Sequence, residues 1–85
     1  MAYKIELATS ARRAFDKLPQ GVQRRLAETI DALAEQPRAA QAVKLTGKDL
    51  YRIRCGDYRV IYQIQDKILL VVVVKIGHRR EVYRD

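Results

Sequence analysis

The chain has 85 residues, 48% of them hydrophobic, and this composition predicts one folded domain over residues 1–85 and excludes a disordered chain. With 17 basic and 10 acidic side chains, the net charge at pH 7 is +7. The one cysteine, Cys55, excludes an internal disulfide and fits a reducing cytoplasm. Residues 1–4 lead into an alternating segment, so we expect no signal peptide, and the apolar run over residues 68–74 is too short to span a membrane.

Positive charge is concentrated in the second half of the chain. Residues 1–43 hold seven basic and five acidic side chains, which gives +2, whereas residues 44–85 hold ten basic and five acidic side chains, which gives +5. Such an excess indicates an acidic partner, either a nucleic acid or an acidic protein that covers the same surface. The alternative is a charge that serves only solubility.

The first half of the chain predicts one strand followed by two helices. Residues 3–8 alternate between apolar and polar side chains, as in a half-buried strand. Thr9 or Ser10 is expected to cap the first helix, Pro19-Gln20-Gly21 to end it, and the second helix to end before Pro37. The apolar positions recur at helical spacing: Ala11, Ala14, Phe15 and Leu18 in the first helix, and Val22, Leu26, Ile30 and Leu33 in the second. Two helices joined by a tight turn form a helical hairpin, whose apolar stripe must pack on another element.

The second half predicts a connection over residues 38–49 and then a series of strands. The strands are expected over residues 50–54, 58–64, 68–76 and 80–84. The first two surround a turn at Cys55-Gly56-Asp57 and form a hairpin. The third is apolar without alternation, which favours an interior strand covered on both faces, and the fourth is short and charged, as in an edge strand. This order predicts an α+β fold in which the helical hairpin covers one face of a twisted sheet and the other face stays open.

The hairpin places arginines on one face of the predicted sheet. Side chains alternate along a strand, so Arg52 and Arg54 share a face, and Arg59 joins them from the second strand. The opposite, core-facing positions are Tyr51, Ile53, Cys55, Tyr58, Val60, Tyr62 and Ile64. A planar guanidinium group donates paired hydrogen bonds that match a phosphate. The arginine face is therefore predicted to hold a phosphodiester.

The same hairpin, together with Gly77-His78-Arg79-Arg80-Glu81-Val82-Tyr83, resembles the RelE/ParE superfamily of bacterial toxins. The resemblance covers essentially the whole chain, and the RelE branch of ribosome-dependent messenger-RNA endoribonucleases is the nearest match. It implies a RelE-like α+β fold with an N-terminal strand, a helical hairpin and antiparallel strands that form one twisted sheet. It also implies the toxin of a type II toxin–antitoxin pair, which inhibits translation by cutting messenger RNA.

The resemblance further implies the site residues and the reaction. The family's catalytic positions fall on Arg52, Arg54, Arg59, Arg79 and Tyr83. A ribose 2′-hydroxyl would attack the adjacent phosphate and leave a 2′,3′-cyclic phosphate and a 5′-hydroxyl, with no metal and no other cofactor. Relatives often carry lysine at the positions of Arg52 and Arg54, and because guanidinium stays protonated, neither arginine serves well as a base. Tyr83 is then the expected base, since nearby cations favour a phenolate, and Arg79 would steady the leaving oxygen.

Other polar residues have both a functional and a structural interpretation. His78 and Glu81 are reserve candidates for acid–base catalysis, against a structural role for His78 and an ion pair for Glu81. Lys44 and Lys48 precede the hairpin and either contact the RNA backbone or are simply solvated. The basic helix residues Arg12, Arg13, Arg24 and Arg25 either touch ribosomal RNA or form an ordinary charged helix face.

The resemblance implies two main partners, an acidic cognate antitoxin and a ribosome with messenger RNA in its A site. Operator DNA would be bound only through the antitoxin complex, no membrane is involved, and the protein would act in the cytoplasm. One alternative is a ParE-like inhibitor of DNA gyrase that cleaves no RNA. The pairing of Arg79 and Tyr83 with Arg52, Arg54 and Arg59 distinguishes the two functions, because gyrase-directed relatives do not require that set. Another is a plain basic nucleic-acid-binding module, against which neither an RRM-like nor a helix-turn-helix signature is evident.

Overall fold

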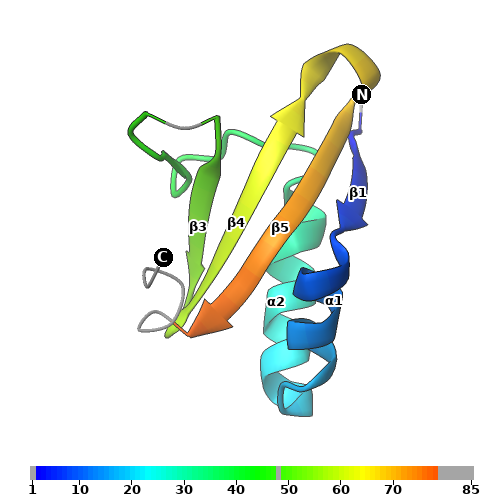
Figure 1. The fold of residues 1–85 in the computed structure, drawn as a ribbon, viewed down its shortest axis with the longest axis vertical. Helices are drawn as coiled ribbons and strands as arrows, with labels where there is room; N and C mark the ends of the chain where they lie inside the picture. Colours follow the sequence, from blue (N-terminus) through cyan, green and yellow to red (C-terminus); the bar gives the residue numbers. More distant parts are fainter. Residues whose placement is uncertain (1, 48, 79–85) are drawn as a thin grey trace.

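Two helices and five strands make up the computed structural model, which describes residues 2–47 and 49–78. The strands are β1 (Lys4–Leu7), β2 (Val43–Lys44), β3 (Tyr51–Cys55), β4 (Tyr58–Gln65) and β5 (Leu70–His78). The helices are α1 (Thr9–Asp16) and α2 (Gln20–Ala32), and a short 3-10 helix, η1 (Asp66–Ile68), joins β4 to β5. The helices lie beside the half of the sheet that holds the β3–β4 turn, and η1 lies at the other end (Figure 1). Neither of these two helices is long and apolar enough to cross a membrane.

The five strands form one mixed sheet in the order β1-β5-β4-β3-β2. The predicted hairpin is present, because β3 and β4 are antiparallel neighbours, and β5 adds a third antiparallel strand on the other side of β4. β1 runs parallel to β5, which is possible because the long helical hairpin, rather than a tight turn, follows β1. The segment over residues 38–49 is more than the expected connection, since β2 pairs with the start of β3. The α+β fold is confirmed.

The start of α1 differs from the prediction. The helix begins at Thr9 itself and follows Ala8, whose side chain provides no cap, so the expected Thr9 or Ser10 cap is wrong. Ser10 instead donates its hydroxyl to the carbonyl oxygen of Val74, 3.4 Å away. That bond ties α1 to β5, so the polar side chain serves tertiary packing rather than the helix end.

The turn between the helices is shorter than Pro19-Gln20-Gly21. Pro19 is extended, with ψ of 149°, and this interrupts the helix as expected. α2 nevertheless starts at Gln20, so Gln20 and Gly21 are helical. The helix ends at Ala32, before Pro37, in agreement with the prediction. The connection is tight enough for the Gln23 side-chain amide to donate to the Phe15 carbonyl at 2.8 Å.

One apolar core lies between the helices and a single face of the sheet. Its buried residues are Ala11, Leu26, Ile30, Leu33, Ile53, Val60, Tyr62, Ile64, Val71, Val73 and Ile76. Tyr51, Cys55 and Tyr58 pack against this cluster, as alternation along the hairpin predicts. The core residues of β3 occupy the set of positions opposite to Arg52 and Arg54. The helices therefore cover one face of the sheet and leave the arginine face uncovered by them.

β5 is an interior strand, as predicted, but only one of its faces is fully covered. Val71 and Val73 have no exposed surface, whereas Val72 and Val74 are half-buried. The unbroken apolar run therefore does not mean equal burial on both faces. The edge strand expected over residues 80–84 lies outside the described residues.

The register of β5 against β4 changes partway along the pair. Ile61 of β4 pairs with Lys75, but the next residue, Tyr62, pairs with Val73. Val74 is therefore an extra residue, a β-bulge on β5. A bulge reverses the alternation of the side chains that follow it. This irregularity decides which residues of β5 face the candidate site.

Candidate functional site

The β3–β4 turn sets the register of the site. Gly56 has φ of +59°, which L side chains rarely adopt, and it is the first of the two turn residues between the paired Cys55 and Tyr58. A glycine at this position is typical of a type II′ turn, whose twist matches that of the strands it joins. The turn places Arg54 directly opposite Arg59.

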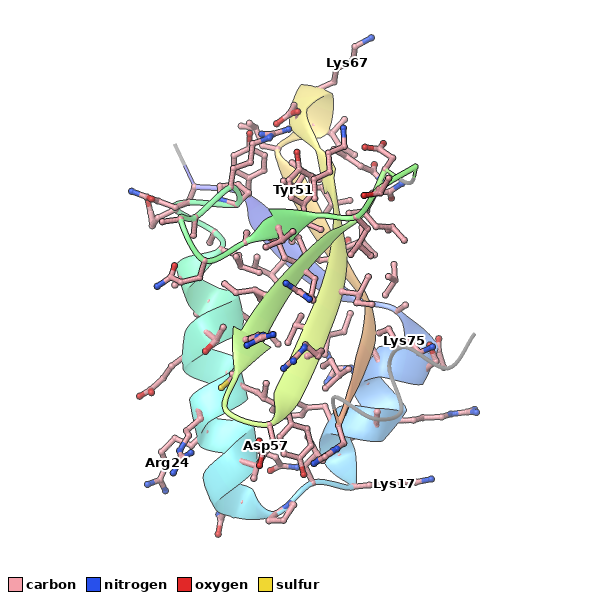
Figure 2. The ribbon with its side chains drawn as sticks, turned by 90° about the vertical axis from the view of Figure 1, so that its left-hand side faces the viewer. Lys17, Arg24, Tyr51, Asp57, Lys67 and Lys75 are labelled. Atoms are coloured by element: carbon pink, nitrogen blue, oxygen red, sulfur yellow. The ribbon has the colours of Figure 1, made fainter. Side chains whose placement is uncertain are left out.

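Basic side chains from three strands meet on the face of the sheet opposite the helices, termed here the open face. Arg54, Arg59 and Gly77 form one row across β3, β4 and β5, and Arg52, Ile61 and Lys75 form the next. Figure 2 shows this hairpin with Tyr51 and Asp57 at its opposite ends. None of the three strands contains Asp or Glu within its bounds. Like charges directly opposite each other destabilise a sheet, so the pairing of Arg54 with Arg59 favours a binding role over a structural one.

Arg59 is buried, with 5% of its surface exposed, although the sheet face that carries it was expected to stay open to solvent. The expected face is right, because the register places Arg59 opposite Arg54. β4 is the middle strand of the sheet, and its two neighbours shield the stem of Arg59 more than an edge position would. Arg54 is exposed and Arg52 half-buried. The Nε atoms of Arg52 and Arg59 are both buried, so these two charges act at a lower effective dielectric than that of Arg54.

Lys75 belongs to the open face, although it was not among the predicted site residues. It pairs with Ile61, which lies outside the core cluster, whereas the adjacent Ile76 is buried in the core. The bulge causes this placement, because unbroken alternation from Val73 would direct Lys75 into the core. A lysine in phase with buried valines is the signal that could have revealed the bulge, since an unpaired lysine is almost never fully buried.

Two of the predicted site residues lie away from the open face. Lys44 is exposed but pairs with Tyr51, so it occupies the other side of the sheet from Arg52. His78 pairs with Tyr58, and the two rings meet edge to face with their centroids 5.7 Å apart. This contact on the helix-facing side agrees with a structural role for His78. The remaining predicted site residues, Lys48, Arg79, Glu81 and Tyr83, lie outside the described residues.

A polar cluster near the η1 end of the sheet was not foreseen from the sequence. Arg38 donates from Nη1 and Nη2 to the two carboxylate oxygens of Asp66, at 3.1 and 2.8 Å. Tyr3 donates its hydroxyl to Asp66 at 2.7 Å, and Nε of Arg38 donates to the hydroxyl of Tyr51 at 3.2 Å. We refer to Tyr3, Arg38, Tyr51 and Asp66 as the sheet-end cluster. The hydrogen bonds from Arg38 and Tyr3 lower the pKa of Asp66 to about 2.

Tyr62 supports the sheet-end cluster from within the core. Its hydroxyl donates to the carbonyl oxygen of Pro37 at 2.6 Å, which supplies the partner that a buried tyrosine hydroxyl needs. Its ring stacks on that of Tyr51, with centroids 5.8 Å apart. Burial raises the pKa of Tyr62 to about 12. Tyr62 therefore remains protonated at neutral pH and serves packing, as predicted.

The basic helix residues Arg12, Arg13, Arg24 and Arg25 are all exposed. Figure 2 shows Arg24 directed away from the molecule. A Cβ on Gly56 would lie 4.0 Å from Nη1 of Arg25, so α2 reaches the β3–β4 turn. A contact of these arginines with ribosomal RNA stays a prediction. Among residues 2–47 and 49–78, no three His, Cys, Asp or Glu side chains gather closely enough to hold a metal ion.

Comparison with known sequences matches this chain to a family and to named relatives. Residues 5–83 match the family model described as the ParE toxin of the type II toxin–antitoxin system parDE. The chain is 34% identical over 90 residues to the mRNA interferase toxin RelE of Escherichia coli K12, a match that spans 100% of this chain and 94% of that protein. It is 30% identical over 86 residues to the toxin RelG of Mycobacterium tuberculosis, over 99% of both chains.

Solved structures agree with these matches. A chain of the toxin–antitoxin complex RelBE2 from Mycobacterium tuberculosis superposes with a TM-score of 0.84 at 28% identity, covering 93% of this chain and 100% of that chain. A chain of the intact RelBE complex from Escherichia coli gives a TM-score of 0.79 at 32% identity, covering 91% and 96%. The fold and the matches define the class as toxins of type II toxin–antitoxin systems. Within that class, the chain belongs to the RelE/ParE superfamily, in its RelE-like branch, which confirms the sequence resemblance.

Proposed function

We propose that this toxin is a ribosome-dependent endoribonuclease that cleaves messenger RNA and so inhibits translation. The observation that carries the proposal is the open face, where Arg52, Arg54, Arg59 and Lys75 gather on strands that contain no Asp or Glu. A surface of this charge suits the backbone of a single RNA strand. The relative named as the mRNA interferase toxin RelE supports the proposal at 34% identity.

The proposed reaction is attack of a ribose 2′-oxygen on the adjacent phosphorus. The new bond closes a 2′,3′-cyclic phosphate, the bond to the 5′-oxygen breaks, a base takes the 2′-hydroxyl proton, and the leaving 5′-oxygen gains a proton. Negative charge builds up on the phosphate oxygens in the transition state, and fixed donors in a poorly hydrated site stabilise such charge strongly. The buried Arg59 and the opposite Arg54 are the proposed donors.

The proton transfers need a group other than an arginine, because guanidinium stays protonated at neutral pH. We assign the base role to Tyr83 and the steadying of the leaving 5′-oxygen to Arg79, both from the family resemblance. His78 contacts Tyr58 on the helix-facing side, which argues against direct contact with RNA on the open face. Glu81 remains the reserve candidate. No step of this mechanism requires a metal or another cofactor.

The proposed partners follow from the charge of the open face and from the relatives. The relatives from Mycobacterium tuberculosis and Escherichia coli were solved as toxin–antitoxin complexes. An acidic cognate antitoxin would neutralise this toxin by covering its basic surface. Operator DNA would be bound only through that complex, and the ribosome would present messenger RNA in its A site. The proposed place of action is therefore the cytoplasm.

One observation favours a second function, inhibition of DNA gyrase. The matching family model is that of the ParE toxin, and it spans residues 5–83. A gyrase inhibitor does not need the open face to hold a reacting phosphate. Loss of the basic side chains would then leave the toxic activity largely unchanged.

Primer-extension mapping of messenger RNA after brief induction of the toxin tests the proposed function. The expected result is new 5′-hydroxyl ends that fall in phase with codons, only in translated regions. The matched control is induction of Lys67→Gln, which removes one positive charge from η1, far from the open face, and should give the same ends. Intact messenger together with gyrase-linked DNA breaks would reject the ribonuclease and support the ParE-like alternative.

A further inference from the structure

The bulge at Val74 gives the open face a basic residue on its third strand. Without the bulge, the basic side chains of the described site would come only from β3 and β4. With it, Lys75 stands at the β5 end of the row that contains Arg52 and Ile61. Bulges often occur beside active sites, where they re-aim a side chain. The extra residue therefore widens the basic surface across the sheet.

The basic residues form two rows rather than one patch. Arg54 and Arg59 belong to the row nearer the β3–β4 turn, and Arg52 and Lys75 belong to the row two residues further along the strands. Two residues along a strand span about 7 Å. This separation is of the same order as that between successive phosphates of an extended RNA strand.

The two rows differ in how tightly their cations can surround a phosphate. Arg54 and Arg59 are directly opposite each other on neighbouring strands. Arg52 and Lys75 are two strand spacings apart, about 10 Å between backbones, with the buried Ile61 between them. The long side chains of Arg52 and Lys75 can reach over Ile61 from both sides. The first row suits a reacting phosphate, and the second suits a phosphate that is only held.

We propose that Lys75, together with Arg52, binds the phosphate next to the one that reacts between Arg54 and Arg59. Lys75 is then a substrate-binding residue that sets the register of the RNA strand on the open face. This inference rests on the proposed function in one respect, namely that the substrate is a single RNA strand. Lysine suits the role because its ammonium is a compact charge on a flexible stem, and it needs no fixed planar geometry.

Equilibrium binding of two short oligonucleotides to the full-length toxin tests the proposal without any cleavage. Both probes carry 2′-deoxyriboses, so the proposed reaction cannot occur, and neither has a terminal phosphate. The first is a dinucleoside monophosphate with one phosphate, and the second is a trinucleoside diphosphate with two. Dissociation constants for both are measured at several salt concentrations with the wild type, Lys75→Gln, Lys75→Met and Lys75→Arg.

The proposal predicts that Lys75→Gln weakens binding of the two-phosphate probe about tenfold and leaves binding of the one-phosphate probe unchanged. The slope of log affinity against log salt for the longer probe should fall by about 0.7, which corresponds to the loss of one phosphate contact. Lys75→Arg keeps the charge and should stay within about threefold of the wild type. Lys75→Met also removes the charge and preserves the stem, so it takes the place of Lys75→Gln in this test if Lys75→Gln folds poorly.

Lys67→Gln is the matched control, because it removes the same charge from η1, and Figure 2 shows Lys67 at the tip of the molecule, away from Lys75. Equal binding of the longer probe by wild type and Lys75→Gln would overturn the proposal, as would an equal loss for both probes or an equal loss in the Lys67 control. The outcome is independent of cleavage in cells. Intact messenger alongside the predicted binding pattern would reject the proposed function alone, and cut messenger alongside unchanged binding would reject only the role of Lys75.

Discussion

Arginines occupy two regions of this toxin that are built in different ways. In the sheet-end cluster, both terminal nitrogens of Arg38 meet the carboxylate of Asp66, and the guanidinium lies 5.7 Å from the ring centroid of Tyr51. On the open face, Arg54 stands opposite Arg59, and the three strands that carry the face hold no carboxylate. The first region pairs its charge with a carboxylate, and the second brings basic side chains from three strands onto one face of the sheet.

The difference predicts that Arg38 stabilises the fold and that the arginines of the open face serve a ligand. An ion pair with an aromatic neighbour ties segments of the chain together, here Tyr3 just before β1, strand β3, η1 and the connection that precedes β2. A cluster of like charges costs stability and persists when an anion binds to it. Substitutions should therefore affect stability in the sheet-end cluster and cleavage on the open face.

The largest effect is expected from Tyr83→Phe, which removes one oxygen and retains the ring. If Tyr83 supplies the acid–base step, single-turnover cleavage on programmed ribosomes should fall by roughly 10²–10⁴ while ribosome binding stays the same. A rate within a few-fold of the wild type would move the base role to Glu81 or His78, with His78→Ala as the next variant.

Substitution of Arg59 should affect both properties, because this side chain is buried on the open face. Arg59→Ala should lower the cleavage rate by roughly 10²–10³ and the free energy of unfolding by about 1–2 kcal/mol, since it removes a charged donor and a packed stem. Arg59→Met retains the stem and should recover the stability but not the rate. Recovery of cleavage in Arg59→Met would show that Arg59 acts through packing alone.

Tyr62→Phe should affect stability alone. The substitution leaves the carbonyl of Pro37 without the 2.6 Å hydrogen bond, at a cost of about 1–2 kcal/mol in the free energy of unfolding. Urea denaturation measures the loss, and the cleavage rate should stay within about twofold of the wild type, because Tyr62 faces the core. A large loss of cleavage with unchanged stability would contradict the assignment of Tyr62 to a purely structural role.

The smallest effect is expected from the pH dependence of the sheet-end cluster. The folded-state pKa of Asp66 is lowered to about 2 by Arg38 and Tyr3, below the unfolded value of about 3.9. The contribution of Asp66 to stability is therefore complete above about pH 4 and is lost as the pH falls towards 2. Asp66→Asn should melt a few °C below the wild type at pH 7, and most of this difference should be lost by pH 2. A difference as large at pH 2 as at pH 7 would point to a cause other than the ionised carboxylate.

Alternation along the hairpin was sufficient to predict the arginine side of the sheet. Tyr51, Ile53 and Val60 reach the core, and Arg52 and Arg54 turn away from it, because a side-chain period of two allows no other arrangement once one face is covered. The positions of the helices and strands were predictable because each type of element has its own period of buried side chains. The burial of Arg59 was not, since exposure depends on what lies on both sides of a strand.

Two other features depend on contacts between distant segments, so the local sequence around each of them indicates it only weakly. The bulge at Val74 exists only in the pairing of β5 with β4, and it moves Lys75 to the open face. The bond from Tyr3 to Asp66 joins residues 63 positions apart, through two residues that local patterns assign to a strand and a turn. Hydrophobic periodicity reports which side of an element is buried but carries no information on such side-chain pairs.

The most direct test of the account compares Arg54→Gln with Arg38→Gln in the same two assays, thermal unfolding and single-turnover cleavage on programmed ribosomes. Arg54→Gln should lower cleavage by roughly 10²–10³ with a Tm within about 1 °C of the wild type. Arg38→Gln should lower the Tm by a few °C and leave cleavage within about twofold. The opposite result, with cleavage lost in Arg38→Gln and retained in Arg54→Gln, would contradict the claim that the open face acts on RNA and the sheet-end cluster holds the fold.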